Sequence, residues 1–122
     1  MANYPHIGLR VFLGPDSVLC STKAGLLQSI SETGSIAAAG RRMGMSYKRA
    51  WYLIDTLNAY FNEPVVVSSK GGPKGGGASL TNTGEQVLAC YLGLQRKSEA
   101  AASADLKQLA SLSGPSRAQK AI

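Results

Sequence analysis

The chain of 122 residues has the usual length of one domain, which leaves little room for a second domain with its own core. It carries 13 basic and seven acidic side chains, giving a formal net charge of +6. His6 is the only histidine, and Cys20 and Cys90 lack the CxxC spacing of a metal site. One histidine and scattered acids also offer no carboxylate pair or nucleophile–base set, so we expect neither a cofactor nor an enzyme.

The start of the chain and its hydropathy bear on location. The first residues lack the basic and apolar regions of a signal peptide, and no apolar run approaches the roughly 18 residues that cross a bilayer. We therefore expect a cytoplasmic protein with no membrane partner. In that compartment the two isolated cysteines should be reduced, and we expect them to be buried.

Basic side chains are concentrated in the middle of the chain. Between Gly34 and Gly77 there are six basic side chains and only two acidic ones. A concentrated positive segment favours a polyanionic partner, of which DNA is the commonest. Charges placed only for solubility are the alternative explanation.

The first elements follow from apolar spacing. Alternating apolar residues predict a strand over 7–13, which a turn over 14–16 ends. Apolar residues at helical spacing then predict a helix from Thr22 or Lys23 to about residue 33, and Gly34 ends it.

Two further helices follow, separated by a short turn. Ser35 predicts the N-cap of a helix that ends near Gly44. Ser46 predicts the N-cap of the next, which runs to about 61–62 because Pro64 prevents its continuation. The residues of this helix that should face the core are Ala50, Leu53, Ile54, Leu57 and Phe61. Two helices joined by so tight a turn are typical of a helix-turn-helix.

Residues 65–69 and 78–80 predict two strands around a loop, Lys70–Gly77, that is rich in glycine and lysine. A β-hairpin directly after a helix-turn-helix is a wing. Because an isolated hairpin is only marginally stable, we expect the N-terminal strand to pair with it in one small antiparallel sheet. The predicted fold class is therefore α+β, a winged helix-turn-helix.

A long C-terminal helix is predicted from Thr83 to Leu112, followed by a tail over 114–122 that we expect to be flexible. The apolar surface of this helix exceeds what a three-helix core covers, which indicates a homodimer. The predicted dimerisation residues are Val87, Leu88, Tyr91 and Leu94. Residues 1–113 would then form one DNA-binding and dimerisation domain.

The first turn of the third helix would enter the major groove of double-stranded DNA. Arginine and lysine there can donate to guanine, and tyrosine rings can contact thymine methyl groups or phosphates. Serines at helix N-termini favour nearby phosphates. The predicted DNA-binding residues are Ser35, Arg41, Ser46, Tyr47, Lys48, Arg49, Tyr52, Lys70 and Lys74.

Several of these assignments have a plain structural alternative. Lys48 and Arg49 would simply lie along the surface if the helix met no DNA. Arg41 and Arg42 could equally belong to a solvated face. Trp51 lies between the apolar and polar stripes, and we assign it to the core because a lone tryptophan on a helix is more often packed than in contact with bases.

The Lys70–Gly77 loop has a second interpretation, as the phosphate-binding loop of a nucleotide enzyme. Such a loop needs GxxxxGK[ST] leading into a helix, whereas glycines and a predicted strand follow Lys74. In a wing, the glycines allow close approach to the DNA backbone, and Lys70 and Lys74 supply charge near a minor groove. A loose tether without DNA contact is the alternative.

Several motifs occur in a specific order: Gly34-Ser35-Ile36, Gly44 to Lys48 followed by Ala50-Trp51, Gly71-Gly72, Lys74 to Ala78, and Leu80 to Gly84. Over about residues 7–94 they resemble the N-terminal DNA-binding domain of the molybdate-responsive ModE transcriptional regulators, which is related to the LysR-type winged helix-turn-helix. The resemblance implies a homodimer joined through the first strand region and the last long helix. It also implies two recognition helices in successive major grooves of a palindromic site.

Full-length ModE regulators carry molybdate-binding β-barrel domains after the DNA-binding domain. No segment after Leu94 resembles one, so we do not expect molybdate binding by this chain. We predict a sequence-specific, dimeric, DNA-binding transcriptional regulator. A non-specific basic nucleic-acid-binding or architectural protein would share the charge and is the alternative.

Overall fold

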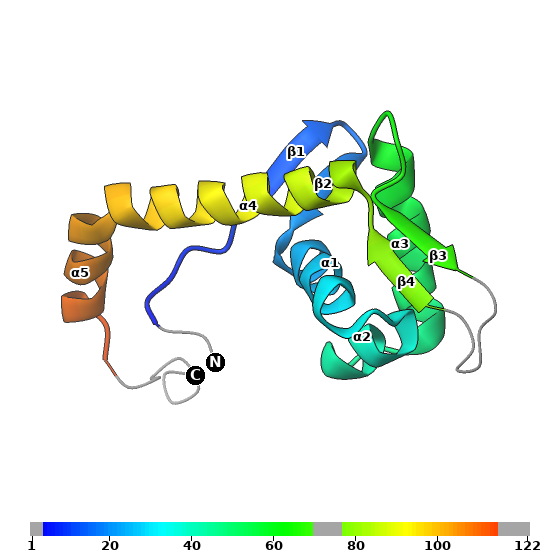
Figure 1. Cartoon of the computed structure of the whole chain (residues 1–122). Helices are drawn as coiled ribbons and strands as arrows, with labels where there is room; N and C mark the ends of the chain where they lie inside the picture. Colours follow the sequence, from blue (N-terminus) through cyan, green and yellow to red (C-terminus); the bar gives the residue numbers. More distant parts are fainter. Residues whose placement is uncertain (1–3, 70–76, 115–122) are drawn as a thin grey trace.

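The computed structural model describes residues 4–69 and 77–114, which form an α+β winged helix-turn-helix (Figure 1). The elements are β1 (Arg10–Gly14), β2 (Ser17–Cys20), α1 (Ser21–Thr33), α2 (Ile36–Arg42), α3 (Tyr47–Tyr60), β3 (Val66–Ser69), β4 (Gly77–Leu80), α4 (Asn82–Ala101) and α5 (Ser103–Leu112). Helices α1, α2 and α3 pack together with β3 and β4 into one body. Helix α4 lies across this body and extends beyond it, and α5 turns away at its far end.

The helix boundaries follow from local capping. Gly34 ends α1 with φ +71°, a left-handed conformation that glycine adopts without strain. The Ser35 hydroxyl accepts a hydrogen bond from the Ala38 amide and so caps α2, as predicted. The Ser46 hydroxyl caps α3 by accepting from the Arg49 amide at 3.0 Å. These boundaries lie within about two residues of those predicted.

The core lies where α1 and α3 meet the strands, and apolar residues predicted on the inner face of α3 are buried there. The largest fully buried aliphatic side chains are Leu26, Leu27, Ile30, Ile54, Leu57 and Val65. They come from two helices and the start of the wing, so the position of α3 depends on the packing of all three.

The N-terminal strand does not join the wing, so the expectation of one three-stranded sheet is wrong. Strand β1 pairs with β2, with Arg10 opposite Cys20, and β3 pairs separately with β4. The turn over 14–16 reverses the chain into the short strand β2. This strand forms the antiparallel hydrogen bonds with β1 that the wing was expected to form. Tertiary contacts support the wing instead: the Ala78 amide donates to the Gly34 carbonyl at 3.0 Å.

The predicted C-terminal helix is two helices, which corrects the expectation of one helix over 83–112. Helix α4 ends at Ala101, and α5 begins at Ser103 at an angle to it (Figure 1). Asp105 lies in the first turn of α5, where a negative charge favours a new helix start. Helix α5 buries none of its residues, and Leu112 is 73% exposed. The apolar residues of α4 and α5 therefore do not form one continuous stripe.

The N-terminal segment runs along α4, which buries a residue that we predicted at the dimer surface. The Tyr91 hydroxyl donates to the Leu9 carbonyl at 2.8 Å, and Gln95 donates to the Ile7 carbonyl at 2.6 Å. Only 2% of Tyr91 is exposed, because its ring packs within this chain, although it also lines the apolar hollow that Leu94 lines; its place in a dimer surface stays a prediction. The cysteines are free, but Cys20 is only half-buried and Cys90 is exposed, contrary to expectation.

Candidate nucleic-acid interface

The turn between α2 and α3 sets the two helices close together. Gly44 adopts φ +69°, and the Met45 amide donates to the Gly40 carbonyl at 2.9 Å. A Cβ at Gly40 would lie 3.5 Å from the Ala50 Cβ, so the helices approach nearly to contact. The N-terminal end of α3, residues 46–49, is solvent-exposed beside this turn.

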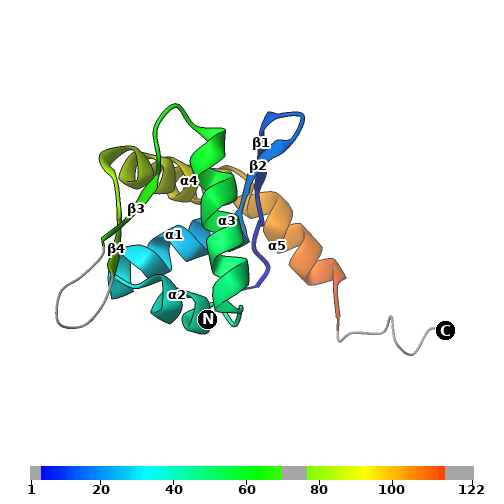
Figure 2. The same cartoon turned by 90° about the vertical axis from the view of Figure 1, so that its right-hand side faces the viewer.

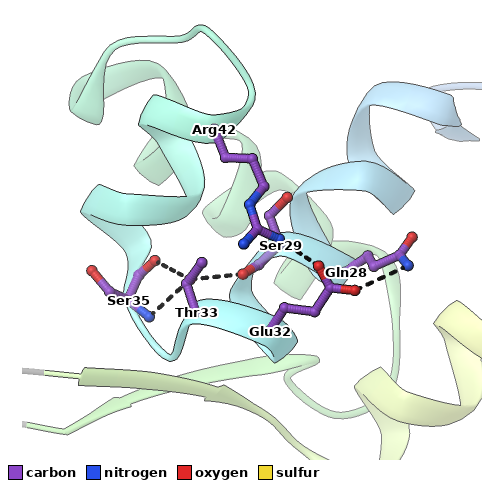
Figure 3. A network of polar contacts seen from close by, with 6 residues as sticks. All are labelled: Gln28, Ser29, Glu32, Thr33, Ser35 and Arg42. Carbon is purple, nitrogen blue, oxygen red and sulfur yellow. Dashed lines mark hydrogen bonds and ion pairs between the residues drawn. The ribbon is translucent and has the colours of Figure 1, made fainter. Parts of the chain in front are cut away.

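A polar network fixes α2 against the end of α1 (Figure 3). The Thr33 hydroxyl donates to the Ser29 carbonyl at 2.7 Å and accepts from the Ser35 amide at 3.3 Å. Glu32 of α1 pairs with Arg42 of α2 and accepts from Gln28. Arg42 is therefore held by a carboxylate, whereas Arg41 is exposed and makes no ion pair within the described residues.

Helix α3 carries exposed basic and aromatic side chains on its outer face. In Figure 2 it lies at the front of the molecule, between the β3–β4 and β1–β2 hairpins. Lys48 and Tyr52 are one turn apart and lie opposite the buried face; Tyr52 is 65% exposed. Tyr47 is 57% exposed and Arg49 is also exposed, on the two flanks of the same helix. Four predicted residues thus converge on one end of α3.

A groove of about 340 Å³ separates the flank of α3 from the wing. Its lining residues are Ser35, Ile36, Ala37, Tyr47, Trp51, Ser68, Ser69 and Gly77. Trp51 packs against the core as expected, but it also lines this groove and meets the Tyr47 ring edge-on, with centroids 6.3 Å apart. Sequence reasoning missed this second role and the wing serines. The one-turn spacing of Tyr47 and Trp51 was the available signal.

The wing is held to α3 as well as to α1. The side-chain oxygen Oδ1 of Asn58 accepts from the backbone amides of Val65 and Val66 at 2.8 and 3.1 Å, which fixes the start of β3 against α3. The helix and the wing strands are therefore joined by direct hydrogen bonds. Lys70 and Lys74, predicted to contact phosphates, lie outside the described residues.

The exposed end of α3, the tight turn before it and the β3–β4 wing together define a winged helix-turn-helix DNA-binding domain. The family model of the bacterial regulatory helix-turn-helix protein, lysR family, matches residues 23–85, just over half of the chain. The chain belongs to this family. The match includes α1 to α3 and the wing, and so covers the whole surface described above.

Three similar proteins have molybdenum or ModE in their names. The chain is 46% identical over 69 residues to the molybdenum-pterin-binding protein MopB of Rhodobacter capsulatus, with 57% of this chain and 26% of MopB aligned. It is 42% identical over 79 residues to the molybdenum transport protein ModE of Azotobacter vinelandii, with 65% of this chain and 29% of that protein aligned. It is 36% identical over 69 residues to the DNA-binding transcriptional dual regulator ModE of Escherichia coli, with 57% of this chain and 26% of that protein aligned.

The matched part of the chain therefore spans between a quarter and a third of each of these relatives, and what is shared is their helix-turn-helix DNA-binding domain. Over residues 4–69 and 77–114, no three acidic, histidine or cysteine side chains are grouped so as to hold a metal ion. No helix in the same ranges combines the length and apolar character of a membrane span.

Proposed function

We propose that this chain is a dimeric, sequence-specific DNA-binding transcriptional regulator of the ModE type. The observation that carries the proposal is the end of α3, where Tyr47, Lys48, Arg49 and Tyr52 are exposed to solvent. The family match and the ModE relatives support the same function.

In this arrangement the recognition helix α3 enters the major groove, and its first two turns contact base edges. Lys48 and Tyr52 lie on the face nearest the bases. The groove beside Trp51 receives the sugar-phosphate backbone of one strand, and hydroxyl groups of Ser35, Ser68 and Ser69 donate to its phosphates. Arg41 lies farther along the same side and adds attraction to the backbone.

The proposed dimer forms through an apolar surface where α4 lies beside β1. Val87, Cys90 and Leu94 of α4 line a hollow with Val11 and Leu13 of the β1 strand. Leu13 and Leu94 are each nearly half exposed, and such adjoining apolar side chains are typical of a surface that a second copy covers. Val87 also packs on the core, so it contributes to both regions, whereas Leu88 packs on the core without lining the hollow.

Selection from a pool of randomised DNA duplexes tests the function. A specific regulator should enrich one motif and bind it about 10³-fold or more tighter than unrelated duplex. Replacement of both Lys48 and Arg49 by alanine should abolish most of this preference. The matched control replaces Arg96 and Lys97, an exposed basic pair on α4, and should retain it.

Two outcomes would contradict the proposal. Equal binding to all duplexes would favour an architectural protein, and unchanged selectivity in the Lys48 and Arg49 variant would exclude α3 as the reading element.

A further inference from the structure

We propose that Asp55 is a specificity-determining residue, which accepts a hydrogen bond from the exocyclic amine of a cytosine in the major groove. This inference rests on the proposed function and names a chemical feature of the sequence that is read.

The position of Asp55 on α3 places it on the reading face. Lys48, Tyr52 and Asp55 stand at i, i+4 and i+7, opposite the buried residues Leu53 and Leu57. The span of seven residues equals that over which other recognition helices contact bases, as in homeodomains. At about 1.5 Å per residue, it covers roughly 10 Å of the helix axis.

Within residues 4–69 and 77–114, no contact accounts for this carboxylate. Asp55 is exposed and makes no hydrogen bond or ion pair with the described residues. The positions three and four residues away are Trp51, Tyr52, Asn58 and Ala59, so α3 provides no cation for it. Asp55 is also the only acidic residue of the helix.

An unpaired carboxylate is repelled by phosphates, so it opposes non-specific attraction of α3 to DNA. This cost is offset only where the groove offers a hydrogen-bond donor. The cytosine N4 amine is the donor that aspartate accepts from in the major groove. Asp55 therefore weakens binding to unsuitable duplexes and favours cytosine at one position.

Selection from randomised duplexes by the whole chain tests the inference with three variants. The wild type should enrich a cytosine at one position of its motif. Asp55→Asn should change that position to adenine, because an amide pairs with adenine N6 and N7. Asp55→Ala should lose the preference there by about five- to 100-fold. Both variants should bind random duplex more tightly than the wild type.

Asp105→Asn is the matched control, since it makes the same change of charge on α5, remote from α3 (Figure 1). It should leave the enriched motif unchanged. Thermal unfolding shows whether each variant keeps its fold. A wild-type motif that Asp55→Asn and Asp55→Ala also enrich, without change at any position, would overturn the role of Asp55 and leave the proposed function standing. Absence of any enriched motif in the wild type would overturn both.

Discussion

Gly84 lies against the backbone of Val65 so closely that a Cβ at this position would be 2.0 Å from the Val65 carbonyl oxygen. The contact joins the first turn of α4 to the start of the wing. Thr81 adds to it: its hydroxyl caps α4 by accepting from the Gly84 amide and donates to the Pro64 carbonyl at 2.7 Å. The Leu80 to Gly84 motif is thus explained by a close approach of two backbones.

Gly84→Ala should destabilise the domain by about 1–3 kcal/mol or more, because the clash is with backbone atoms that cannot rotate away. The control is Gly93→Ala on the same helix, where a Cβ meets only the end of the Arg96 side chain at 3.8 Å. It should be neutral or stabilise by up to about 1 kcal/mol. Urea unfolding measures both, and equal stabilities would contradict the contact.

The two roles assigned to Ser46 can be separated. Ser46→Ala removes the cap of α3 and should reduce stability by about 0.5–2 kcal/mol. Ser46→Asp keeps the cap and adds a favourable charge at the helix N-terminus, but it places that charge near the DNA backbone. We expect it to unfold like the wild type and to bind DNA markedly more weakly. Undiminished DNA binding would mean that this end of α3 does not approach a phosphate.

The proposed dimer depends on Leu94. Leu94→Ser should shift the protein toward monomer at micromolar concentration, as measured by sedimentation equilibrium, because it removes apolar surface from the α4 hollow. Leu92→Ser is the control: Leu92 is 39% exposed and lines a different hollow, next to His6. A wild-type protein that is monomeric with and without DNA would contradict the dimer.

Lys23 should contribute to stability although it is charged and only 8% exposed. Its ammonium donates to the Val18 carbonyl at 2.9 Å and to the Tyr60 hydroxyl at 2.6 Å, which connects β2, α1 and the end of α3. Lys23→Met leaves both oxygens without this donor and should cost about 1–3 kcal/mol. Lys97→Met, on the exposed surface of α4, should cost little. Equal unfolding midpoints for the two variants would argue against the bridge.

DNA binding by this chain should not require molybdate. A tetrahedral oxyanion needs several convergent donors, whereas α5 buries none of its residues and the hollow that Leu109 and Ala110 line with Tyr4 and Pro5 is mainly apolar. Calorimetric titration with molybdate and tungstate should give no binding heat, and neither ion should change the affinity for the enriched duplex. Micromolar binding that alters DNA affinity would reveal an effector site.

Local sequence determined helices α1 to α3 and the helix-turn-helix. Caps at Ser35 and Ser46 and the left-handed Gly34 act through hydrogen bonds to amides or carbonyls a few residues away, so neighbouring residues suffice to predict them. The basic and aromatic end of α3 could be predicted for the same reason. Helical spacing alone separates its outer face from its buried one.

Tertiary structure decided what depends on residues distant in sequence. Tyr91 is buried because its hydroxyl meets the Leu9 carbonyl, 82 residues earlier, and helical periodicity carries no information about that contact. The support of the wing by Gly34, rather than by the N-terminal strand, likewise depends on the packing of β4 on α1. Trp51 lines the groove only because the wing folds back beside α3. Such contacts depend on chain topology, whereas caps and helix faces depend on local geometry.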